Sequence, residues 1–226
     1  ILTLEITLAT ARLRWALLFG LVASMMALGR DQVAFLGCLS LAMIVVVETV
    51  SSETPWRFLR GRLLSLIIAG IVVIAILALP SLLTMQLLAD SNRPAISYGV
   101  AAAGSMAPVN LATMFVPNVF GSLNWTYDYW GPGYETSPRP DHTDRAINYM
   151  FLGTAPALLL FWRGVGGGRL AERGLRAFLV IGLFALFYTL GRATPFFSAA
   201  FDLVPGVKLY RRPADASFLL AFALAV

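Results

Sequence analysis

The run LLSLIIAGIVVIAILAL (Leu63–Leu79) contains no charged residue, and it decides the fold. A helix that crosses the hydrocarbon of a bilayer needs about 20 mostly apolar residues. Leu63–Leu79 is close to that length, and mostly apolar neighbours extend it to Leu88. Lipid offers no hydrogen-bond partner to the backbone of an open strand. We therefore predict a transmembrane helix over 63–88.

The composition of the whole chain agrees with this prediction. The 226 residues are 58% hydrophobic and 13% charged, with a mean hydropathy of +0.77. A soluble domain is about 45–50% apolar and about 25% charged. Further helices are predicted over the other apolar runs, at 13–29, 33–50, 147–162, 175–191 and 215–226. We expect an all-α, polytopic transmembrane helical bundle in which 1–226 is part of a single transmembrane domain.

Two segments near the N-terminus are open to more than one interpretation. Ile1–Thr10 alternates apolar and polar residues, which suits a strand or the tail of an earlier helix. Arg12 and Arg14 followed by an apolar stretch resemble a signal peptide. A second apolar run follows almost at once, which favours a spanning helix. Because the chain starts without Met and stops inside an apolar run, we expect an internal piece of a longer protein.

Several functions are disfavoured by residue content. The single Cys38 excludes a disulfide framework or a thiolate metal site. The 17 basic residues form no block of the kind that binds nucleic acid. Asp141, His142 and Asp144 have a spacing that can hold a divalent cation, but they include the only histidine, so a solvated loop is expected. We expect no metal and no cofactor.

The arginines predict the orientation in the membrane. They concentrate at Arg12 and Arg14, in Ser51–Arg62 and in Arg163–Arg176. By the positive-inside rule these segments are cytoplasmic. The turn Gly29–Gln32 is then exoplasmic. So are the long loop 90–146, with short interfacial helices, and the stretch Leu190–Ser217.

That last stretch reads LGRATPFFSAAFDLVPGVKLYRRPADAS and carries Arg211, Arg212 and Lys208 on the side where basic residues are disfavoured. Adjacent guanidinium groups suit a phosphate, which they can bind in bidentate fashion. One interpretation is that these side chains reach lipid headgroup phosphates. The other is that they bind an anionic ligand at the membrane face.

The loop 90–146 and the turn before it supply further candidates. Trp125, Tyr127 and Trp130 stand close together, either as an interfacial aromatic belt or as a surface that stacks on sugar rings. Val109–Val119 is predicted to be a short interfacial or re-entrant helix. Asp31 is a candidate base or sugar ligand, although an Arg30–Asp31 turn that simply caps two helices is the simpler interpretation.

Three patches resemble the YfhO family of bacterial polytopic membrane proteins. The first is the turn Gly29–Gln32, with Arg30 where we expect a histidine in the family. The second is FVPNVFG (Phe115–Gly121), followed by INYMFLG (Ile147–Gly153). The third is LGRATPFF and LVPGVKLYRRPADASF, within 190–218.

This resemblance implies a GT-C-like glycosyltransferase in the bacterial inner membrane. Such an enzyme transfers a sugar from a polyprenyl-phosphate donor to a cell-envelope glycopolymer or lipid at the outer face. In this class the catalytic acidic residue usually lies in the first outer loop, which we expect upstream of Ile1. The alternatives are a non-catalytic membrane subunit that binds a partner protein or lipid through its outer loop, and a lipid or solute transporter. Transport is disfavoured because the charged residues cluster at helix ends.

Overall fold

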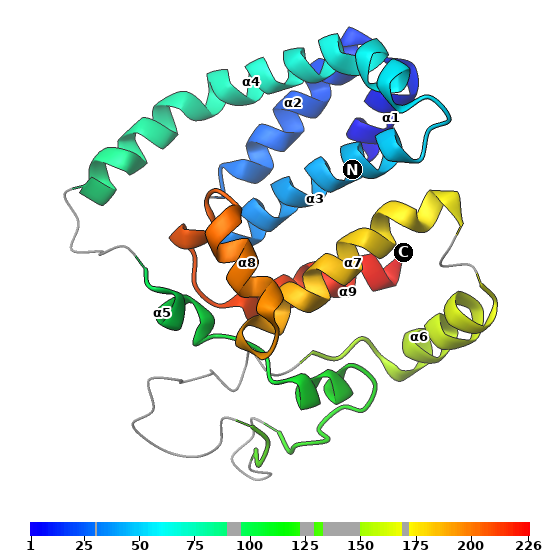
Figure 1. Ribbon diagram of the computed structural model, residues 1–226, viewed down its shortest axis with the longest axis vertical. Helices are drawn as coiled ribbons and strands as arrows, with labels where there is room; N and C mark the ends of the chain where they lie inside the picture. The colour runs from blue at the N-terminus through cyan, green and yellow to red at the C-terminus, as the bar shows by residue number, and fades with distance from the viewer. Residues whose placement is uncertain (30, 90–95, 123–128, 133–149, 169–171) are drawn as a thin grey trace. The chain divides into compact units, whose positions relative to one another are not determined.

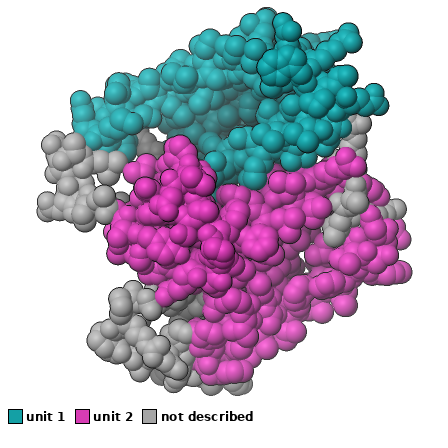
Figure 2. All heavy atoms as spheres, in the orientation of Figure 1, with its two compact units in different colours: residues 1–94 teal, residues 95–226 magenta. Residues whose placement is uncertain are grey.

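A computed structural model describes residues 1–29, 31–89, 96–122, 129–132, 150–168 and 172–226. The chain forms two compact units, Ile1–Pro94 and Ala95–Val226 (Figure 2). Their boundary lies within the predicted loop 90–146. Every regular element among the described residues is helical, which confirms the predicted all-α class (Figure 1).

The first unit consists of four helices, α1 (Leu2–Thr10), α2 (Leu13–Ala27), α3 (Gln32–Val50) and α4 (Pro55–Ala89). The alternating segment at the start of the chain is therefore a helix. Helix α2 packs chiefly against α4 and also contacts α1 and α3 (Figure 1).

The C-terminal end of α1 is capped by side chains of α4. Helix α1 ends at Thr10, and the next residue, Ala11, adopts a left-handed conformation with φ of 51°. The last carbonyls of a helix have no partner within the helix. Arg62 donates from Nε to the Leu8 carbonyl, and Ser65 donates from Oγ to the Ala11 carbonyl at 3.0 Å. Arg62, predicted only as a marker of the cytoplasmic side, thus also stabilises the end of α1.

Small residues bring α2 and α4 close together. A Cβ on Gly20 would lie 2.8 Å from the Ala69 carbonyl oxygen and 2.8 Å from the Val72 Cβ. Helices in lipid associate through such close contacts, because the hydrophobic effect adds little between helices there. The buried hydroxyl of Ser24 donates to the Gly20 carbonyl at 2.6 Å, so it needs no partner on another helix.

Replacement of Gly20 by alanine is expected to lower the thermal stability of the protein in detergent micelles. The added methyl group forces α2 away from α4, which costs about 1–3 kcal/mol. Gly70 is the matched control on α4, because a Cβ there meets no atom within 4 Å. Gly70→Ala should be neutral or stabilising by up to about 1 kcal/mol. Equal unfolding midpoints for the two variants would contradict the close contact.

Helices α3 and α4 are long and apolar enough to cross a membrane. Helix α4 has 35 residues and includes Pro80, whose carbonyl accepts a bond of 2.7 Å from the Thr84 hydroxyl. Many of its leucines and isoleucines are exposed, as expected for a surface that faces lipid. The apolar helices 13–27, 176–189 and 213–225 are shorter, so that they also span the membrane stays a prediction.

The second unit is organised around α7 (Arg176–Thr189). It packs along α9 (Ser217–Ala225), where a Cβ on Gly182 would sit 3.5 Å from the Ala223 Cβ. Helix α8 (Pro195–Leu203) contacts α7 and α5 (Tyr98–Ala102) through aromatic rings (Figure 1). The rings that meet there are Tyr98, Phe184, Phe187, Tyr188, Phe196, Phe197 and Phe201.

Three predicted helices differ clearly in extent from those observed. The helix predicted over 63–88 begins earlier, at Pro55, the first residue of α4. The run 147–162 becomes helical only at α6 (Thr154–Leu159), which continues as a π-helical turn (Leu160–Gly166). Gly153, with φ of 96°, sets this start, and residues 147–149 lie outside the described part. The segment predicted as a helix over 109–119 overlaps instead with a 3₁₀ helix, Pro108–Met114. Its position in the membrane interface stays a prediction.

Candidate functional site

Both ends of the stretch 190–217 bind the same short segment, Ala101–Met106. At one end, the Arg192 N–H donates to the Ser105 hydroxyl at 2.9 Å, and the Met106 N–H donates to the Thr189 carbonyl at 3.0 Å. At the other end, two further backbone bonds join the segment to the turn that precedes α9. They run from the Arg212 N–H to the Ala101 carbonyl at 3.2 Å and from the Ala214 N–H to the Gly104 carbonyl at 3.1 Å.

Two glycines make this arrangement possible. A Cβ on Gly104 would lie 2.6 Å from the Arg212 Cα. Gly191 has a φ of 49°, and a Cβ there would lie 1.9 Å from the Ser105 hydroxyl oxygen and 3.1 Å from the Pro213 Cγ. The turn after α7 therefore touches the turn before α9, and Ala101–Met106 contacts both.

Arg212 has an unusual backbone conformation. Its φ is 64°, in the left-handed region, which costs a residue with a Cβ about 1–2 kcal/mol. Pro213 and Ala214, which follow, are buried, whereas the side chain of Arg212 is exposed. Strained residues of this kind persist only where their surroundings hold them, and they cluster at functional sites.

Arg192 joins this region, although it was not among the predicted site residues. Its guanidinium Nη2 donates to the Ala103 carbonyl at 3.0 Å, and its side chain is exposed. The contact between Gly191 and Pro213 places Arg192 and Arg212 on neighbouring turns. Arg211 is exposed on the same turn as Arg212.

Lys208 is held by α8. Its Nζ lies 3.8 Å from an Asp202 carboxylate oxygen and 5.4 Å from the centre of the Phe201 ring. Both partners of the ion pair are well exposed, so it adds little stability. The three basic residues grouped in the prediction therefore have different surroundings.

Two neighbouring aromatic residues of the loop 90–146, Tyr129 and Trp130, differ in burial. Tyr129 is fully buried; its hydroxyl accepts from the Asn110 amide at 3.1 Å and donates to the Pro132 carbonyl at 2.9 Å. The neighbouring Trp130 is 65% exposed and meets Phe120 edge to face, with ring centres 5.2 Å apart. Trp130 thus keeps much of its surface available to a ligand, while Tyr129 belongs to the core.

The remaining predicted candidates lie elsewhere. Trp125 and Tyr127 fall outside the described residues, as does the Asp-His-x-Asp segment 141–144. Asp31 belongs to the first unit and caps α3: one carboxylate oxygen accepts from the Ala34 N–H at 2.7 Å. This bond supports the simpler interpretation of Asp31. Within the described ranges, no group of three or more His, Cys, Asp or Glu side chains could hold a metal ion.

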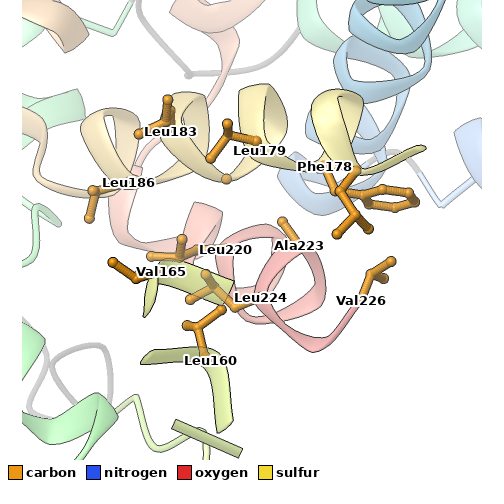
Figure 3. A pocket seen from close by; sticks show the side chains of 12 residues that line it. Leu160, Val165, Phe178, Leu179, Leu183, Leu186, Leu220, Ala223, Leu224 and Val226 are labelled. Atoms are coloured by element: carbon orange, nitrogen blue, oxygen red, sulfur yellow. The ribbon is translucent and has the colours of Figure 1, made fainter. Parts of the chain in front are cut away.

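A cavity of about 240 Å³ lies in the second unit, between α7, α9 and the π-helical turn 160–166 (Figure 3). The side chains drawn around it are hydrocarbon. A charged or sugar group would find no hydrogen-bond partner among them, and burying it unpaired would be costly. The arginine-bearing turns are therefore the better candidate for polar chemistry.

No family model matches the chain, and no curated protein or solved structure matches it. The resemblance to the YfhO family therefore stays an expectation, and the geometry of the site has to support the function by itself.

The importance of Gly104 can be tested by its replacement with alanine. The methyl group would collide with the Arg212 backbone, so we expect a loss of about 1–3 kcal/mol in stability. Gly99 in α5 is the control, because a Cβ there meets no atom within 4 Å. Thermal unfolding in detergent should show a lower midpoint for Gly104→Ala only. A shift of the same size in Gly99→Ala would contradict this assignment.

Proposed function

We propose that the chain is part of a membrane glycosyltransferase that takes a sugar from a polyprenyl-phosphate donor. The acceptor is a cell-envelope glycopolymer or lipid, and the reaction occurs at the outer face of a bacterial inner membrane that the protein crosses several times. In this proposal Arg211 and Arg212 bind the donor phosphate, and Lys208 adds positive charge nearby.

One observation carries the proposal: an exposed arginine stands on a strained backbone held by buried neighbours. Arg212 keeps its left-handed conformation because Gly104 packs against it and Ala101 accepts its N–H. Contact with headgroup phosphates needs only a long flexible side chain near the interface. A backbone fixed at this cost suits a ligand that must be held in one position.

The arginine-bearing turn is followed by an apolar helix, which also suits a lipid-linked donor. The turn with Arg211 and Arg212 leads through a 3₁₀ turn (Pro213–Ala216) into α9, which is apolar after Ser217. A polyprenyl phosphate has a hydrocarbon tail that stays in lipid and a phosphate that lies at the membrane surface. Charged donors beside an apolar helix match both parts. Trp130, with its exposed ring, is the described candidate for stacking on the sugar.

Loss of Arg212 is expected to reduce sugar transfer by about ten- to a hundredfold, the contribution of one charge-assisted hydrogen bond. Arg212→Gly is the sharpest variant, because glycine accepts φ of 64° without strain and should leave the fold intact or more stable. Arg211→Ala should raise the donor KM. Transfer from radiolabelled polyprenyl-phosphate sugar to acceptor, with full-length protein, measures both effects.

Unchanged transfer by both variants, at equal amounts of inserted protein, would refute the phosphate role. If the unaltered full-length protein gives no transfer, a non-catalytic subunit that binds a partner protein or lipid becomes the better interpretation.

The different burial of Trp130 and Tyr129 leads to a separate prediction. Trp130→Ala should leave the free energy of unfolding within about 0.5 kcal/mol and raise the KM for the sugar-bearing donor. Tyr129→Ala should instead destabilise the protein by about 3–5 kcal/mol, because it removes a buried aromatic ring. Thermal unfolding and transfer kinetics on the two variants distinguish the ligand surface from the core. A Trp130→Ala variant with unchanged KM would exclude sugar stacking by this ring.

A further inference from the structure

Two arginines that are distant in the sequence converge on consecutive residues of one segment. The Arg192 guanidinium donates to the Ala103 carbonyl at 3.0 Å. The Arg212 side chain passes directly over the next residue: a Cβ on Gly104 would lie 2.7 Å from the Arg212 Cγ and 2.8 Å from its Cβ. Both arginine side chains are exposed.

The backbones that carry these arginines are also tied together. Gly191 and Pro213, their immediate neighbours, are in contact. Ser105 accepts the Arg192 N–H, and Ala101 accepts the Arg212 N–H. Neither arginine can move away without breaking a contact to the segment 101–105. The two side chains therefore start from fixed positions on adjoining turns.

The charge of this surface favours an anion. Arg192, Arg211 and Arg212 are all exposed on two adjoining turns, and Asp215, after Arg212, is half-buried. Positive charges held near one another repel, and an anion between them lowers that energy. A guanidinium has five N–H donors in a planar fork that fits phosphate oxygens. Nη2 of Arg192 reaches Ala103, and a phosphate contact would use other N–H groups of the same fork.

We propose that Arg192 is a phosphate-binding residue and that Arg192 and Arg212 grip the donor phosphate from two sides above Ala103–Gly104. This inference rests on the proposed function and adds to it the second half of the phosphate site. It explains why glycine is required at both 104 and 191: a side chain at either position would push one of the turns away from the segment 101–106. A headgroup contact would not require this convergence of two distant turns.

Arg192→Gln is the variant that separates charge from structure. Glutamine lacks the positive charge but keeps an N–H donor that can reach the Ala103 carbonyl. We expect its affinity for a radiolabelled short-chain prenyl phosphate to fall about ten- to a hundredfold, with an unchanged unfolding midpoint. Arg163→Gln, on the π-helical turn, removes one positive charge elsewhere in the same unit and should bind as the unaltered protein does. Scintillation proximity with full-length protein in detergent gives these affinities.

Each further outcome decides between explanations. If Arg212→Gln loses affinity and Arg192→Gln does not, the role of Arg192 is refuted while the proposed function stands. If the unaltered protein binds the prenyl phosphate no better than the uncharged prenol, the proposed function fails, and this inference fails with it. Displacement of the probe by phosphatidylglycerol would assign the arginines to lipid headgroups, and displacement by inorganic phosphate at similar concentration would assign them to a soluble anion. Either result overturns the proposal.

Should Arg192→Gln lower the unfolding midpoint, Arg192→Lys replaces it. Lysine keeps the charge but lacks the planar fork. Partial retention of prenyl phosphate binding, with steeper loss in high salt than in the unaltered protein, supports a direct ionic contact. Binding that is independent of salt in both proteins refutes it.

Discussion

The second unit depends on the close approach of two backbones, at Gly104 and Arg212. The distance leaves no room for a side chain at position 104, and it requires a left-handed conformation at Arg212. From this contact follow the position of the turn before α9, the burial of Pro213 and Ala214, and the exposure of Arg212. The cost at one residue is compensated by several hydrogen bonds and by the packing of α9 on α7.

The fold class could be predicted from the sequence because it depends on local properties. Apolar runs such as Leu63–Leu79 determine where helices form in lipid, and no distant residue is needed to recognise them. Capping by Asp31 could also be predicted from the sequence, because the residue directly precedes the helix that it caps. The helix that starts at Thr154 was predicted to start at 147, because its start depends on the φ of Gly153 and on the hydrogen bonds that Met150 exchanges with the Thr113 hydroxyl.

The candidate site was only partly predictable, because its contacts join residues far apart in the chain. Arg211 and Arg212 stood out as adjacent charges in a stretch that the positive-inside rule predicts to be exoplasmic, where basic residues are disfavoured. Arg192 did not stand out, because its position depends on the hydrogen bond to the Ala103 carbonyl. Nothing in the sequence links these two residues. Tyr129 showed the opposite problem: in the sequence it stands beside the candidate Trp130, yet its hydroxyl bonds to Asn110 and Pro132 place it in the core.

The length of α4 has a consequence for the membrane itself. From Leu63 to its end at Ala89, the apolar part of this helix measures about 40 Å at 1.5 Å per residue. The hydrocarbon of a bilayer is about 30 Å thick. If α4 crosses a bilayer, as its length and composition allow, an upright helix would leave roughly 10 Å of apolar surface in the headgroups. It would then have to lean or to bend near Pro80, where one backbone hydrogen bond is missing. Bilayer thickness would then change the angle of α4, which makes this helix sensitive to lipid chain length.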